Sequence, residues 1–119
     1  LDLKFSKRSY GPVHIDISFK SRDHGDNEGF DGEGGVLAHS FYPLYGGDVH
    51  FDDDEMWKVG NKFKDAGISL KHVAAHEFGH ALGLPHLPHK EVGLNDGLEL
   101  IFPDFAQVGI NGRFGTNIP

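Results

Sequence analysis

The sequence has no cysteine among its 119 residues. Disulfide cross-links, thiolate metal sites and cysteine nucleophiles are therefore excluded within this chain. Long apolar runs are missing as well, since no stretch approaches the ~18–20 residues that a membrane-spanning helix requires. No charged-apolar-small pattern of a secretion signal is visible at the N-terminus, so we expect any targeting segment to have been removed or to lie outside this sequence.

Basic residues are also scarce. Lys and Arg total 11 against 18 Asp and Glu, which gives a formal net charge of −7 with neutral histidines. This charge disfavours a phosphate backbone, so we expect no nucleic-acid partner. A chain of this length accommodates one compact core, and we expect a monomer with a single domain over residues 1–119.

Histidine and glycine, in contrast, are abundant. The chain has nine His and 17 Gly, while its 38% apolar residues are typical of a globular protein. Because disulfides are excluded, another kind of cross-link is needed to order Gly-rich loops. Metal ions are the obvious candidates, since a site formed only on folding adds its binding energy to folding.

Three segments predict strands and loops. Apolar and polar residues alternate over residues 13–19, which predicts a half-buried strand, and more weakly over residues 3–5. Residues 24–55 are rich in Gly and Asp but contain two short apolar pieces, 36–38 and 49–51. We expect long ordered loops around two short strands here, because a Gly-rich stretch of this length inside a compact domain needs something to order it.

One segment has a helical pattern, residues 69–82. Ser69 is a favourable N-cap, apolar residues recur at three- and four-residue intervals, and Gly83 ends the pattern. The strands and this helix together predict an α+β fold, a short β-sheet that carries one helix.

The strongest chemical signal lies on this helix, in the sequence HEFGHALGLPH over residues 76–86. His76 and His80 lie one turn apart, so both imidazoles leave the same helix face and can bind one ion. Gly83 lets the chain turn sharply and return His86 to the same point. Three neutral nitrogens with an open fourth position are typical of a catalytic zinc, and Glu77 beside the ion is placed to accept a proton from water. A His-rich surface helix is the alternative interpretation.

Further motifs resemble the matrix metalloproteinase catalytic domains of the metzincin clan. The resemblance runs from Phe5 to His86 and includes, in order, HGD at 24–26, FDGxGGxLAH at 30–39 and GDxHFDDDExW at 47–57. It implies a zincin-type α+β fold in which a zinc-binding active-site helix is attached to a short twisted mixed β-sheet, with the family's first strand and first helix absent. It also implies a secreted zinc endopeptidase that acts on extracellular proteins.

The resemblance implies a second, structural zinc site. Its ligands would be His24, Asp26, His39 and His50. Three nitrogens and one carboxylate form a complete tetrahedral set without a vacancy, which is the chemistry of a structural site. Scattered loop histidines are the alternative.

Calcium is the third implied metal. The main site would combine carboxylates with backbone carbonyls, both hard oxygen ligands, from Asp31, Gly32, Gly34, Val36, Asp52 and Glu55. Asp53 with Glu55, and Asp48 by itself, are candidates for further calcium sites, although His14 replaces an aspartate that the family uses beside Asp48. A solvated acidic turn over residues 52–55 is the alternative.

The resemblance also implies where a peptide substrate binds. Gly35, Val36, Leu37 and Ala38 would form an edge strand above the zinc, to which an extended peptide adds as a further strand. An apolar pocket beside the zinc would accept the side chain after the scissile bond, with Phe102 and Pro103 in the segment that forms its wall.

Two departures from the family pattern bear on activity. The family's methionine below the zinc is replaced by Ile101, since the single Met of the chain is Met56. The final helix is interrupted by three glycines, Gly109, Gly112 and Gly115, each of which disfavours a helix by ~1 kcal/mol.

We therefore expect a zinc- and calcium-dependent endopeptidase that holds two zinc ions and at least one calcium ion. The alternative is a catalytically degenerate or incomplete module of the same family, which binds metals and peptide without turnover. The intact zinc-binding motif favours the enzyme, whereas the lost methionine and the missing first helix favour the module. A metal-buffering or structural protein would have no need of Glu77.

Overall fold

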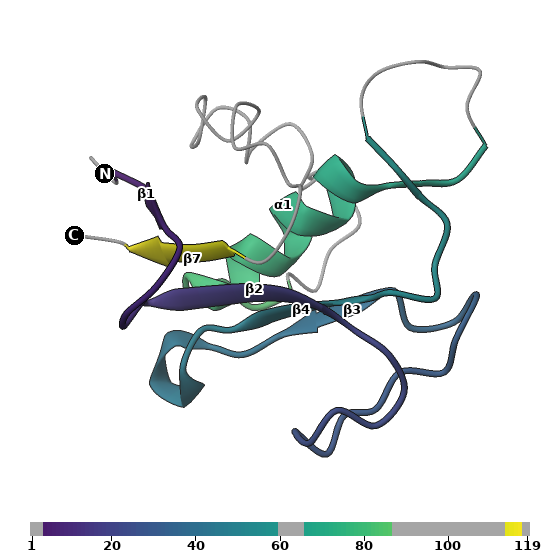
Figure 1. Cartoon of the computed structure of the whole chain (residues 1–119), viewed down its shortest axis with the longest axis horizontal. Helices are drawn as coiled ribbons and strands as arrows, with labels where there is room; N and C mark the ends of the chain where they lie inside the picture. Colours follow the sequence, from purple (N-terminus) through teal and green to yellow (C-terminus); the bar gives the residue numbers. More distant parts are fainter. Residues whose placement is uncertain (1–3, 60–65, 87–113, 118–119) are drawn as a thin grey trace.

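The computed structural model of the chain describes residues 4–59, 66–86 and 114–117 (Figure 1). Its strands are β1 (Ser6–Arg8), β2 (Ile15–Lys20), β3 (Ala38–Ser40), β4 (Val49–Asp52), β5 (Trp57–Lys58), β6 (Ile68–Ser69) and β7 (Phe114–Asn117). Its helices are the short 3₁₀ helix η1 (Pro43–Tyr45) and the α-helix α1 (Leu70–Ala81).

Five of the strands form a mixed sheet in the order β1-β7-β2-β4-β3. β2 and β4 are parallel, with Phe19 opposite Phe51, whereas β3 pairs antiparallel with β4 and β7 pairs antiparallel with both β1 and β2. Figure 1 shows α1 lying across one side of this sheet. The predicted α+β fold with a short mixed sheet and one zinc-motif helix is therefore confirmed, and β3 lies at an edge of the sheet.

The core lies between the sheet and α1. Ile15 and Ile17 of β2 are buried while Asp16 between them is exposed, as the alternating pattern predicts. Val49 and Phe51 of β4 are also fully buried. The helix completes the core with residues spaced by three and four positions, Leu70, Ala74, Phe78 and Ala81. Burial of this face fixes the direction in which the opposite face of the helix presents its histidines.

Both ends of α1 have a capping motif. Ser69 is the N-cap, and its side chain accepts a hydrogen bond from the backbone N–H of His72 at 3.4 Å. At the C-terminus Gly83 has φ 98°, Gly83 N–H donates to His80 O at 2.8 Å, and Leu84 N–H donates to Gly79 O at 2.9 Å. These paired bonds form a Schellman motif, and glycine suits it because the left-handed conformation disfavours a Cβ. The predicted helix and its sharp exit are confirmed.

The strand expected near residues 35–38 is displaced toward the C-terminus. β3 begins only at Ala38, and Val36 is exposed rather than paired in the sheet. The reason is the turn before it, in which Gly32, Gly34 and Gly35 all have positive φ. Leu37 still bonds to β4, because its carbonyl oxygen accepts a hydrogen bond from Asp52 N–H at 2.9 Å.

The rest of residues 24–55 is an ordered loop around β3, η1 and β4, as expected. In the described part of the chain, no helix is long and apolar enough to cross a membrane. Ile101, Phe102, Pro103, Gly109 and Gly112 lie outside the described residues. Gly115, expected to interrupt a final helix, lies instead in β7, opposite Arg8 of β1 and Asp16 of β2.

Candidate metal centres

The three histidines of the helix motif converge on one point. The Nε2 atoms of His76 and His80 lie 3.1 Å apart, those of His76 and His86 3.1 Å, and those of His80 and His86 2.9 Å. α1 supplies the first two rings from one face, and the turn at Gly83 brings back the third. The predicted three-histidine group is therefore present.

Hydrogen bonds and burial prepare these nitrogens for a cation. His80 Nδ1 lies 2.6 Å from Leu84 O, and because a carbonyl only accepts, Nδ1 carries the proton and Nε2 keeps its lone pair. Burial lowers the pKa of His76, and the neighbouring His80 and His86 lower it further against the opposing charge of Glu77. A neutral imidazole is the form that binds a metal.

The donor set fits zinc. Ligand nitrogens at a normal zinc distance in tetrahedral geometry are separated by about 3.3 Å, close to the separations among the three Nε2 atoms. A neutral imidazole nitrogen either donates or accepts, so three mutually facing nitrogens cannot all pair with one another. A cation at their centre satisfies all three lone pairs and leaves a fourth position open.

Glu77 lies beside this group rather than in it. Its side chain is buried, and Oε2 accepts a hydrogen bond from Ser40 Oγ at 2.6 Å. Next to Glu77 lies a pocket of about 390 Å³, between residues 36–38 and α1. The pocket is lined by Val36, Leu37, Ala38, His72, Val73, His76 and Glu77. His72 is exposed and is not one of the three grouped histidines.

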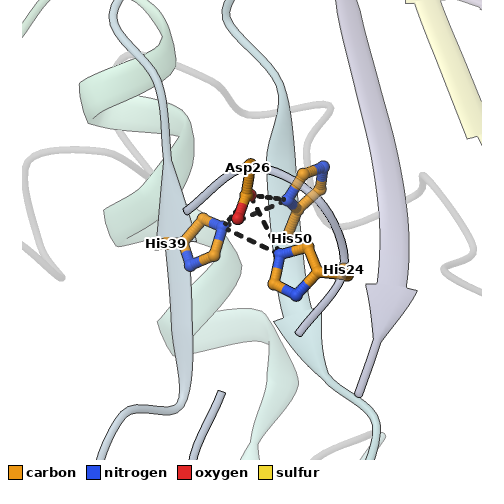
Figure 2. A group of neighbouring side chains, drawn as sticks. All are labelled: His24, Asp26, His39 and His50. Atoms are coloured by element: carbon orange, nitrogen blue, oxygen red, sulfur yellow. Dashed lines mark hydrogen bonds and ion pairs between the residues drawn. The ribbon is translucent and has the colours of Figure 1, made fainter. Parts of the chain in front are cut away.

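The second predicted group is also assembled, around a single oxygen. Asp26 Oδ2 lies 2.9 Å from His24 Nε2, 2.8 Å from His39 Nε2 and 2.9 Å from His50 Nδ1. Figure 2 shows the three imidazoles gathered around this carboxylate, one from β3, one from β4 and one from the loop after β2. Four ligands leave no vacancy, which is the arrangement of a structural zinc site.

Protonation states in this second group also suit a metal. Burial raises the pKa of Asp26, but hydrogen bonds from Glu28 N–H, His39 and His50 outweigh it, and the pKa lies well below its ordinary 3.8. Burial lowers the pKa of His50. His24 Nδ1 lies 2.9 Å from the carbonyl oxygen of Arg22, which directs its other nitrogen to the group.

The acidic residues expected to bind calcium do not form a group as compact as the two histidine groups. Asp52 and Glu55 are buried, and one oxygen of each, Asp52 Oδ2 and Glu55 Oε1, has no hydrogen-bond partner among the described residues. Such buried carboxylate oxygens are costly unless a cation or donor satisfies them. Asp31 is exposed, and both of its carboxylate oxygens accept from Val36 N–H, at 3.2 and 3.3 Å. Its carboxylate also lies where a Cβ on residue 35 would be, so only glycine fits there.

The candidates for further calcium sites have other surroundings. Asp48 Oδ1 accepts from Asp16 N–H at 3.2 Å and so ties the start of β4 to β2. Asp53 is exposed. In the described ranges, two groups place three or more His or acidic ligand atoms within 4.8 Å of one another, and both are the histidine groups above.

Three residues near these sites were missed by the sequence analysis. Phe30 is buried and stacks on His24 and His39, with ring centroids 4.9 and 4.7 Å away. Arg22 donates a hydrogen bond to the backbone oxygen of Asp31 at 2.9 Å and so stabilises the turn that contains Asp31. Ser40 contacts Glu77. Strand alternation places Ser40 on the opposite side of β3 from His39, but it does not reveal the contact with Glu77, which depends on the packing of α1 against β3.

Comparisons with known proteins agree with this geometry. The matrixin family model matches residues 1–96. Macrophage metalloelastase of Oryctolagus cuniculus is 45% identical over 111 residues, covering 92% of this chain and 22% of that protein. The hatching enzyme of Paracentrotus lividus is 44% identical (88% and 18% covered). Interstitial collagenase of Bos taurus is 56% identical over 86 residues (71% and 18%). The chain thus spans about a fifth of the length of these relatives.

Proposed function

Since the chain belongs to the matrixin family, we propose that it is a zinc-dependent endopeptidase that hydrolyses peptide bonds in extracellular proteins. One observation carries this proposal above the others. Three imidazole nitrogens converge with a fourth position open, and a carboxylate from the same helix lies beside them without joining them. A metal-storage or structural site would not require such a carboxylate.

The residues of this centre would divide the chemistry between them. His76, His80 and His86 would hold zinc, which when bound polarises a scissile carbonyl and acidifies a water molecule. Glu77 would accept the proton of the attacking water and pass it to the leaving amine, so that one carboxylate acts first as base and then as acid. Glu77 is buried beside a largely apolar pocket, so few other water molecules would compete for this transfer.

The peptide would bind along β3. This strand lies at the edge of the sheet, with β4 on its inner side, so its other side is available for an added strand. Val36 and Leu37, which precede β3, line the pocket together with Ala38 and the α1 residue Val73. An apolar side chain of the substrate next to the scissile bond fits such a lining. The contribution of Phe102 and Pro103 to the pocket wall rests on the family resemblance alone, because both lie outside the described residues.

The second centre would hold a structural zinc. His24, Asp26, His39 and His50 would bind it and leave no position for substrate. Because two ligands come from the loop and two from neighbouring strands, the ion would attach the loop after β2 to the sheet.

Calcium would bind at the acidic residues Asp31, Asp52 and Glu55. The two buried carboxylate oxygens without partners, on Asp52 and Glu55, are the observation that supports it. Asp31, with backbone oxygens of Gly32, Gly34 and Val36, would complete the oxygen ligands that calcium requires. Further calcium at Asp53 or Asp48 stays a weaker proposal, because Asp48 is engaged by Asp16.

A cleavage assay tests the proposed function. The zinc-loaded chain is incubated with a peptide library in which a large apolar residue follows one bond, and products are identified by mass spectrometry. Cleavage should occur before the apolar residue, stop on addition of a zinc chelator and return when zinc is restored. A fully zinc-loaded chain that cleaves no peptide would instead make the non-catalytic module the correct function.

A further inference from the structure

The hydrogen bond between Ser40 and Glu77 joins two elements that are far apart in the sequence. Ser40 is the last residue of β3, and its Oγ lies 2.6 Å from Oε2 of Glu77 on α1, 37 positions later. A hydroxyl donating to a carboxylate at this distance is a short, charge-assisted hydrogen bond. In the described part of the chain, Ser40 is the hydrogen-bond partner of the Glu77 side chain.

We propose that Ser40 is the positioning residue that fixes the orientation of the Glu77 carboxylate for proton transfer. This inference rests on the proposed function, since it assigns Glu77 the role of base. With Oε2 held by the hydroxyl, the carboxylate presents Oε1 to the water molecule that attacks the peptide. Without the hydroxyl, the carboxylate is free to rotate and is in a reactive orientation for less of the time.

Burial makes the hydroxyl important. Glu77 is 8% exposed, so few water molecules can replace a lost donor. A buried carboxylate that loses its donor pays the desolvation cost of an unsatisfied charged group. It would recover that cost by turning toward another donor or cation, including the metal itself, and would then no longer act as a base.

The same bond connects the base with the peptide-binding edge. Side chains alternate along a strand, so Ala38 and Ser40 share one side of β3. Ala38 lines the pocket together with Glu77, which places the substrate segment and the base on that side. A shift of β3 on peptide binding would therefore move the donor of Glu77 as well.

Four variants separate this role from a packing role. Ser40→Ala removes the hydroxyl. Ser40→Thr and Ser40→Val are matched in shape, and only threonine keeps the hydroxyl. Ser21→Ala is the control, because Ser21 is an exposed serine outside both metal centres. Each variant is first checked for zinc content and for far-UV circular dichroism equal to those of the unmodified chain.

The kinetic arm measures kcat and KM separately on one apolar peptide. Ser40→Ala and Ser40→Val should lower kcat by about 10-fold, the factor expected for one hydrogen bond to a charged group, with little change in KM. Ser40→Thr should keep kcat within about twofold, and Ser21→Ala should not change it. Equal kcat values for the threonine and valine variants would overturn the proposal.

A second arm needs no turnover. Acetohydroxamate binds zinc through both oxygens and can donate a hydrogen bond to an adjacent carboxylate, so its Kd reports the orientation of Glu77. Its Kd should rise by about 10-fold in Ser40→Val but not in Ser40→Thr. If the unmodified chain is zinc-loaded but inactive, the proposed function fails and this arm still decides the role of Ser40. An equal Kd for all Ser40 variants would contradict it. If Ser40→Val does not fold, the comparison of Ser40→Ala with Ser40→Thr decides the same question.

Discussion

His39 and Ser40 are adjacent on β3 and serve opposite sides of the sheet. His39 Nε2 lies 2.8 Å from Asp26 Oδ2 in the four-ligand group, and Ser40 Oγ lies 2.6 Å from Glu77 Oε2 beside the three-histidine group. A single short strand therefore contacts both candidate metal centres. The four-ligand centre would therefore stabilise both the loop after β2 and β3, the strand that carries Ser40, the hydrogen-bond donor to Glu77.

Asp26→Asn tests this connection from the four-ligand side. The amide keeps the shape of the side chain but loses the charge that three imidazoles surround, so zinc should bind this centre at least ~100-fold more weakly. Such a loss lowers the free energy of unfolding by about 2.7 kcal/mol at saturating zinc. Zinc content should fall from two ions to one per chain, and hydrogen exchange should increase in the loop after β2.

Glu28→Gln is the matched control for that variant. It removes one carboxylate from the same loop, but only the backbone N–H of Glu28 contacts Asp26. Zinc content and exchange should therefore be unchanged. Two zinc ions retained in Asp26→Asn would show that the oxygen at the centre of Figure 2 is not a ligand.

Calcium should stabilise the chain through Asp52 and Glu55. Each has a buried oxygen without a hydrogen-bond partner in the described part of the chain, so an added cation relieves a cost that the calcium-free protein bears. Titration with calcium at constant ionic strength should raise Tm, by about 4–8 °C for each kcal/mol of stabilisation in a domain of this size.

Glu55→Gln should lose most of this calcium-dependent rise in Tm. Glu33→Gln, an exposed acidic residue in the neighbouring turn, should keep all of it. A Tm that does not respond to calcium in the unmodified chain would refute the calcium site.

Acid should release zinc and destabilise the chain over the same range of pH. The pKa values of His50 and His76 are lowered from the ordinary 6.5 by burial, so below about pH 6.5 the unfolded chain binds more protons than the folded one. The free energy of unfolding of the metal-free chain therefore falls as the pH falls through this range. The lowered pKa of Asp26 adds a further loss below its ordinary 3.8.

Zinc dissociation follows the same direction, because protons compete with zinc for the imidazole nitrogens. Zinc content after dialysis, and urea unfolding of the metal-free chain, should both decrease from about pH 7.5 to pH 5. Stability of the metal-free chain that rises on acidification would show that the histidines gain protons in the folded state, contrary to this prediction.

Much of this arrangement follows from local sequence. The i, i+4 spacing of His76 and His80 and the Gly83 exit determine the three-histidine group, because helix geometry and the capping motif depend on neighbouring residues. The strand Ile15–Lys20 and the helix follow from their apolar patterns for the same reason. These elements were predictable without knowledge of the rest of the chain.

Long-range contacts were less predictable. The start of β3 is displaced to Ala38 by positive-φ glycines whose conformations no apolar pattern reveals. Ser40 meets Glu77 only because α1 packs against β3, and Phe30 stacks on two histidines only after the loop has closed. Contacts of this kind depend on tertiary packing and not on local sequence.

The role of Glu77 as the base of a zinc endopeptidase is tested by comparing Glu77→Gln with His80→Ala on one peptide. Glutamine keeps the shape and the partner Ser40 but cannot accept a proton, so zinc should stay bound while kcat falls by ~10²–10⁴-fold. His80→Ala should lose one zinc and activity together. Cleavage by the Glu77→Gln variant at the rate of the unmodified chain, with zinc content equal in both, would contradict the account.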